Sequence, residues 1–210
     1  RLRSRGLGDV YKRQIMCVST FVLLLFSCVN KPKVENISPL KMKLTSFLDT
    51  FYLQHSKCIA NDIRRQDDGR ALFLDFLSFL KDDPGFVSEL PMKFEGLLEY
   101  EKGDSCLVKF SYSYYWLCNN LEKYEASKDY QTSFQLYSII GREQASYLID
   151  NNLYFISGVP QYHVQDLILP SGKLLPITYP KITESVIHDK QPDFDLGILI
   201  VDSLSFKLAK

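Results

Sequence analysis

The spacing of apolar residues changes near Asp82, and this change constrains the fold more than any other feature of the sequence. Before it the apolar residues recur at helical spacing, and after it they alternate with polar residues. The first helix is expected to start at the N-cap Ser38, followed by Pro39, and its apolar stripe runs to Ile59. The second is expected over residues 70–81, whose interior is almost wholly apolar. Helices followed by strands predict an α+β domain.

The clearest strand signal is a hairpin with one solvated face, closed by a turn at residues 101–104. Its core-facing residues are expected to be Met92, Phe94, Leu98, Tyr100, Cys106, Val108, Phe110 and Tyr112. Further strands are expected at residues 130–140, 145–149, 153–157, 164–169, 173–178, 196–201 and 204–208. We therefore expect two N-terminal helices packed on an antiparallel, strongly curved sheet of about seven strands. This order resembles both an NTF2-like cone and an OB-like barrel, and the sequence does not separate the two.

An uncharged apolar run of 13 residues, 15–27, is too short to cross a bilayer, which takes about 20 residues of helix. Its length is typical of the apolar core of a secretory signal peptide, which is removed after export. The residues Leu25, Phe26 and Ser27 before Cys28 resemble the lipobox of bacterial lipoproteins, in which an aliphatic, a variable and a small residue precede the acylated cysteine. An ordinary cleaved signal peptide and a retained anchor or buried strand are the alternatives.

The resemblance to lipoproteins implies that Cys28 becomes the first residue of the mature protein and carries fatty acyl chains such as palmitate. Residues 28–40 then form a polar tether, and residues 41–210 form a single α+β domain. Acyl chains hold such a protein on a membrane without crossing it. The tether has no acidic run after the cysteine and no aspartate at Val29, which in this family implies the periplasmic face of the outer membrane. The expected location is the bacterial cell envelope.

Residues 1–14 resemble translated adapter sequence from the ends of assembled metagenomic fragments, and we treat them as a non-native leader. The alternative is an authentic basic arm that binds nucleic acid or anionic lipid. Without residues 1–27 the chain keeps 20 of its 25 basic and 24 of its 25 acidic residues. This mildly acidic balance offers no footprint for a polyanion, so nucleic acid is not an expected partner. The expected partners are the membrane, through the lipid anchor, and an unknown envelope protein, peptide or glycan.

Three cysteines remain in the expected domain, Cys58, Cys106 and Cys118. An oxidising envelope permits one disulfide with one spare thiol, and Cys106 with Cys118 is the candidate pair because they lie close in sequence. The alternative is that all three are small buried side chains. No spacing of cysteine and histidine indicates a zinc site, and no cofactor is expected.

The stretch SYSYYW carries the candidate binding residues Tyr112, Tyr114, Tyr115 and Trp116 at the end of a predicted strand. Aromatic faces at such a position stack on sugars or hold peptides. The alternative is core packing, for which a sheet normally uses aromatic side chains.

The candidate metal ligands precede the last long strand, where His188, Asp193 and Asp195 are close in sequence and Asp189 adds a further carboxylate. Nitrogen and oxygen ligands of this kind suit a divalent cation. The alternative is a solvated loop, because the glycine-punctuated spacing of a calcium loop is absent and Lys190 adds a positive charge.

His55 lies one helical turn before Cys58, a spacing that would orient a thiolate, whereas a histidine at the edge of the core is the simpler interpretation. His163 is expected to be exposed on a strand. No nucleophile-elbow, Walker A, dinucleotide-binding or HExxH motif is present, so no sequence motif supports a catalytic function.

The expected function is therefore binding of a ligand or partner, or a structural role, by a membrane-anchored envelope protein. The alternative is an envelope hydrolase or metal-dependent enzyme that uses the cluster of His188, Asp189, Asp193 and Asp195. A pocket lined by Trp116 and tyrosines would favour binding, whereas converging histidine and carboxylates would favour catalysis.

Overall fold

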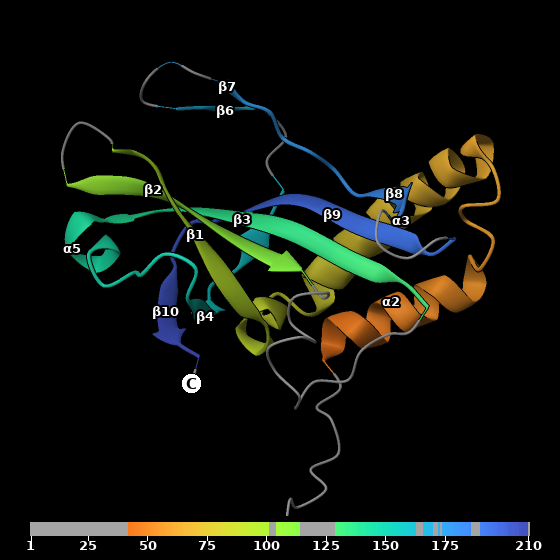
Figure 1. Cartoon of the computed structure of the whole chain (residues 1–210), viewed down its shortest axis with the longest axis horizontal. Coiled ribbons are helices and arrows are strands. Elements are labelled where there is room, and N and C mark those ends of the chain that lie inside the picture. The colour runs from red at the N-terminus through yellow and green to blue at the C-terminus, as the bar shows by residue number, and fades with distance from the viewer. Residues whose placement is uncertain are drawn as a thin grey trace, which may run out of the picture. The chain divides into compact units, whose positions relative to one another are not determined.

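Figure 1 shows the computed structural model of the chain, which describes residues 42–100, 104–113, 129–162, 166–169, 172, 174–185 and 190–209. Residues Pro39–Lys210 form one compact unit. Helices and a mixed, strongly curved half-barrel sheet give it the predicted α+β fold. The predicted leader, signal peptide and tether lie outside the described residues. None of the helices in the described part of the chain is long and apolar enough to cross a membrane.

Helix α2 (Lys43–Gln54) buries Leu44, Leu48 and Phe51 on one face, at the spacing that the sequence indicates. Its N-cap is Met42, which has an extended backbone and is buried, so the predicted start at residue 38 is wrong. The helix also ends earlier than its apolar stripe suggests, because the residues after Gln54 form turns.

Helix α3 (Asp62–Asp82) ends where the sequence predicts but begins eight residues before the predicted Arg70. Its N-cap is Asn61, whose side chain accepts a hydrogen bond from Arg64 N–H at 2.9 Å. The first two turns are mostly polar, so apolar periodicity does not reveal them. A short 3-10 helix, η1 (Phe86–Glu89), follows and leads into the sheet.

Among the described residues, eight strands form one sheet in the order β10-β4-β1-β2-β3-β9-β5, with β8 also paired to β9. They are β1 Pro91–Tyr100, β2 Ser105–Ser113, β3 Gln131–Gly141, β4 Leu153–Ser157, β5 Pro160–Gln161, β8 Lys181–Glu184, β9 Pro192–Val201 and β10 Ser205–Leu208. The predicted antiparallel sheet includes one parallel pair, β3 with β9. After β3 the chain crosses to the far side of the sheet, where β4 pairs with β1. It then returns and adds β9 beside β3 in the same direction.

The predicted β1–β2 hairpin is confirmed, with Phe94 opposite Phe110. Its alternation fails beyond Gly96, which has a φ of 130° and lies at one of the register irregularities of this pair. A β-bulge changes the face on which the following side chains lie. Leu98 is consequently 42% exposed, and its predicted place in the core is wrong.

The predicted strand at residues 145–149 is wrong, because the short helix α5 (Arg142–Ala145) and a turn occupy this part of the chain. Ser146 N–H donates to the carbonyl of the first helical residue at 3.1 Å. Tyr147 and Ile149 are both exposed, so their alternation does not mark a core face. The strand β4 that follows has the predicted bounds.

Strand β6 (Leu167–Ile168) pairs antiparallel with β7 (Leu174–Leu175), which confirms that these segments form the predicted hairpin. Both strands are shorter than predicted. Leu175 packs against a small second cluster of buried side chains, Leu107, Tyr137, Leu169 and Ile198. Strands β5 and β8 are not predicted by the sequence, because β5 has only two residues and β8 has a single apolar residue, Ile182.

The main core lies between the helices and one face of the sheet, and aromatic rings occupy its centre. Phe76 of α3 is fully buried there. Its ring centroid lies 5.7–6.1 Å from those of Phe47, Phe79, Phe86 and Tyr162. These rings fix α3 on the sheet and thereby place the outer face of the helix.

Candidate functional site

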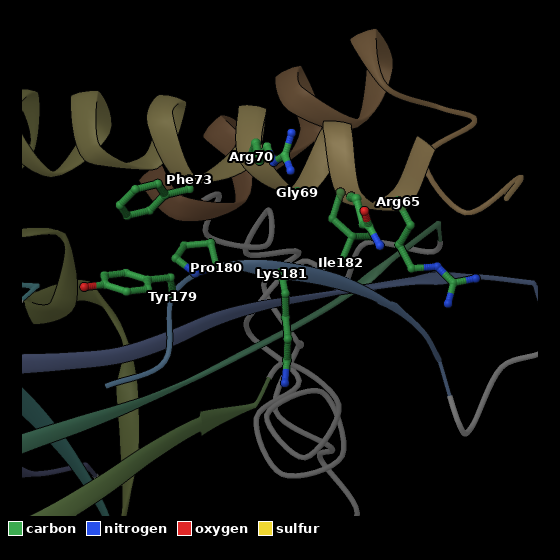
Figure 2. A pocket seen from close by; sticks show the side chains of 9 residues that line it. Arg65, Gly69, Arg70, Phe73, Tyr179, Pro180, Lys181 and Ile182 are labelled. Atoms are coloured by element: carbon green, nitrogen blue, oxygen red, sulfur yellow. The ribbon is translucent and has the colours of Figure 1, made fainter. Parts of the chain in front are cut away.

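A groove of about 390 Å³ lies between α3 and the segment that enters β8 (Figure 2). Its volume is within the range of ligand sites, about 300–1,000 Å³. It is lined by Arg65, Gln66, Gly69, Arg70, Phe73, Tyr179, Pro180, Lys181 and Ile182. Apolar and aromatic side chains thus meet basic ones in a single depression.

One wall of the groove is a single face of α3. Arg65, Gly69 and Phe73 are spaced by four residues, so they follow one another along the helix surface. A Cβ atom at Gly69 would lie 3.7 Å from the backbone nitrogen of Ile182 and 3.9 Å from the Cα of Lys181. The helix therefore packs directly against the backbone of β8 at this glycine.

The other wall is the segment that enters β8, and β9 holds it in place. Ile198 N–H donates to the Thr178 carbonyl at 2.9 Å. Gly197, with a φ of 78°, allows the two backbones to approach. The side chain of Lys181 points away from α3 (Figure 2) and lies 3.2 Å from Asp195, between Nζ and Oδ2. Its ammonium group therefore lies away from the groove wall formed by α3.

Three rings meet at one end of the groove. The Phe73 centroid lies 5.1 Å from that of Tyr179 and 5.8 Å from that of Tyr162, both in edge-to-face geometry. Tyr162 is mostly buried behind them, and its hydroxyl donates to the Leu196 carbonyl. Burial raises the pKa of Tyr162, and the Asp195 carboxylate adds to the rise. Tyr162 therefore stays protonated and holds the other two rings in position.

The charged groups that line the groove are basic, and no carboxylate among the described residues lines it. Figure 2 shows Arg65 at the end opposite the rings of Phe73 and Tyr179. Arg65 Nη2 lies 3.7 Å from Asp62, whose side chain is 88% exposed, and Arg70 Nη1 lies 3.8 Å from Asp67. Both distances exceed a normal hydrogen bond, so these are weak surface pairs.

The aromatic stretch at the end of β2 is described only in part. Tyr112 is 1% exposed, and its ring stacks on Phe134 with 5.1 Å between centroids. Its ring therefore contributes to core packing and does not face a ligand. Tyr114, Tyr115 and Trp116 lie outside the described residues, and their binding role stays a prediction.

The predicted metal ligands are likewise described only in part. Asp193 and Asp195 lie two residues apart on β9, whereas His188 and Asp189 lie outside the described residues. Burial raises the pKa of Asp193, and the Asp195 carboxylate adds to the rise. Within the described ranges, no three histidine, cysteine or acidic side chains are grouped as metal ligands. The metal site stays a prediction.

His55 links the end of α2 to α3. Its Nδ1 lies 2.8 Å from Asp68 Oδ1, and its ring stacks on Phe51 with 4.3 Å between centroids. Cys58 is fully buried, and burial raises the pKa of its thiol to about 11, with the Asp68 carboxylate adding to the rise. A thiol with this pKa is protonated at neutral pH and is no activated nucleophile. The contacts of His55 are those of a histidine at the edge of the core. The third histidine, His163, lies outside the described residues.

Cys106 is buried on β2 and forms no disulfide with another described residue. Its candidate partner Cys118 lies outside the described residues, so the disulfide stays a prediction.

Comparison with known proteins finds no matching family, no matching curated protein and no matching solved structure. The choice between an NTF2-like and an OB-like fold therefore stays open. The sequence does not indicate the groove, because neither the first turns of α3 nor strand β8 shows apolar periodicity. The four-residue spacing of Arg65, Gly69 and Phe73 is the sequence feature that indicates a shared helix face.

Proposed function

We propose that the chain is a membrane-anchored protein of the bacterial envelope that binds a small ligand in the groove between α3 and β8. The observation that carries this proposal is the lining of the groove, where the partly exposed rings of Phe73 and Tyr179 lie beside basic residues. Aromatic faces beside a few charged groups in a depression are typical of ligand sites. The lipobox-like residues before Cys28 support the anchor.

A metal-dependent hydrolase at His188, Asp189, Asp193 and Asp195 is the competing proposal. Its support is weaker, because Asp195 already accepts a hydrogen bond from Gly197 N–H at 3.0 Å and pairs with Lys181. We therefore favour binding.

Replacing Cys28 by serine is expected to move the protein from the membrane fraction to the soluble fraction, because the cysteine sulfur carries the acyl chains in lipoproteins. Labelled palmitate should enter the wild-type protein and not the Cys28→Ser variant. Cys17→Ser is the matched control, since this residue lies in the predicted signal peptide, and it should behave like the wild type. A Cys28→Ser variant that stays on the membrane would contradict the anchor.

Replacing Phe73 by alanine is expected to weaken binding of an apolar probe about tenfold, because one of the two exposed rings of the groove is lost. The probe is N-phenyl-1-naphthylamine, titrated by fluorescence into the full chain carrying Cys28→Ser. Leu74→Ala is the control, because Leu74 lies on the same helix, is 62% exposed and does not line the groove. The groove is not a binding site if the parent protein fails to bind the probe, or if both variants weaken binding equally.

A further inference from the structure

The side chains that line the groove also indicate the charge of its ligand. This inference rests on the proposed function. We infer that the groove selects small amphiphilic anions, with an apolar or aromatic body against Phe73 and Tyr179 and a carboxylate, phosphate or sulfonate at Arg65 and Arg70. The body would then contact the rings at one end of the groove, and the head group the arginines, of which Arg70 lies beside Phe73 and Arg65 at the far end (Figure 2).

The first step is the sign of the charge. Arg65, Arg70 and Lys181 line the groove, and among the described residues none of its lining side chains is acidic. Lys181 is already paired with Asp195, so the two arginines are the cations left to a ligand. A depression with walls of one charge raises the local concentration of the opposite charge.

The second step is the hydrogen bonding of Arg65. A guanidinium has five N–H donors, and within the described part of the chain the Nε of Arg65 is buried without an acceptor. Its nearest carboxylate, on Asp62, is 3.7 Å from Nη2 and almost fully exposed. The Arg65 side chain is 30% exposed, so an anionic head group that reached its exposed part would supply a charge-assisted hydrogen bond that this carboxylate does not provide.

The third step is the size of the ligand, which follows from how α3 covers β8. Ser185 N–H donates to the Gln191 carbonyl at 2.8 Å. Hydrogen-bonded and non-hydrogen-bonded pairs alternate along an antiparallel ladder, so Thr183 and Lys181 also form hydrogen-bonded pairs with β9, whereas Ile182 does not. The peptide groups of Ile182 therefore point away from β9, toward α3.

Gly69 of α3 closes this edge of the sheet. An added strand would need about 4.8 Å beside β8, whereas a Cβ built at Gly69 already lies 3.7 Å from the Ile182 nitrogen. A peptide therefore cannot extend the sheet beside Ile182 beneath α3. The space that remains, about 390 Å³, suits a small molecule.

The test compares two fluorescent probes with similar aromatic bodies in the full chain carrying Cys28→Ser. 1-Anilinonaphthalene-8-sulfonate is an anion, and N-phenyl-1-naphthylamine lacks the sulfonate. Arg70→Glu should weaken binding of the anion five- to tenfold and change binding of the neutral probe less than twofold. Added salt should likewise weaken binding of the anion more than binding of the neutral probe.

Arg64→Glu is the matched control, because it makes the same change in charge on an exposed residue of α3 outside the groove. It should leave both probes within twofold of the parent protein. Equal losses of the anion in Arg64→Glu and Arg70→Glu would overturn the assignment to the groove, since they would reflect the field of the whole helix.

The outcomes separate this inference from the proposed function. If the neutral probe binds and Arg70→Glu affects both probes alike, selection of anions is wrong while binding in the groove stands. If neither probe binds, the proposed function fails as well. Decanoate should displace the bound anion at least tenfold more effectively than decanol. Stronger displacement by an acidic peptide, or only by phosphatidylglycerol vesicles, would overturn the assignment to a small soluble amphiphile.

Discussion

Replacing Gly197 by alanine is expected to lower the free energy of unfolding by about 4 kcal/mol, because two penalties combine at this residue. The first is its φ of 78°, which L-residues adopt at a cost. The second is steric, since an added Cβ would lie 2.1 Å from the Thr178 carbonyl oxygen and 2.8 Å from its carbon. Both atoms belong to the backbone and cannot rotate away. Urea denaturation followed by circular dichroism measures the loss.

Gly85→Ala is the control for this substitution. Gly85 has a φ of −94°, and a Cβ there would meet no atom within 4 Å, so the unfolding free energy should change by less than about 0.5 kcal/mol. Similar small effects at both glycines would show that β9 can bend away from Thr178. The groove would then have a movable wall, because the hydrogen bond between Ile198 and Thr178 is what holds the segment entering β8.

The sequence predicts an element well where one face is buried along its whole length. The β1–β2 hairpin and β4 were found from their alternation and turns, and the end of α3 from its acidic and proline-containing stop. Elsewhere a bulge and a turn made the same reasoning fail. Gly96 introduces a bulge that turns Leu98 outward, and an apparent alternation at Tyr147 and Ile149 belongs to a turn. The parallel pairing of β3 with β9 depends on the path of the chain, which periodicity does not encode.

The groove could not be predicted because its parts are unremarkable in isolation. Arg65 and Gly69 belong to the polar turns of α3 that lack apolar periodicity, and β8 is a strand of four residues. They become a site only when the aromatic core fixes α3 against β8. Phe73 faces the groove and contacts Tyr162, which in turn contacts Phe76 in the core. Tests of function must therefore avoid residues whose loss unfolds the domain.

Phe76 is the clearest such residue, and Phe76→Ala is expected to lower the free energy of unfolding by about 4 kcal/mol. Its side chain is fully buried, and the four rings around it come from α2, α3, η1 and the segment after β5. Removing it leaves a cavity where these elements meet, and the surrounding rings are too large to collapse into it. The midpoint of urea denaturation should fall sharply, with no change in the charge of the protein.

Two further substitutions on α3 determine whether cavity formation is the cause. Phe76→Leu keeps much of the volume and should cost about half as much as Phe76→Ala. Leu74→Ala removes a large apolar side chain that is 62% exposed, so it should cost less than about 1 kcal/mol. If Leu74→Ala destabilised the protein as much as Phe76→Ala, the face of α3 that carries Leu74 would also be covered, and the burial of only one face of this helix would be wrong. If Phe76→Leu instead costs about half as much unfolding free energy as Phe76→Ala, the packing of the ring cluster beneath the groove is what stabilises α3 against the sheet.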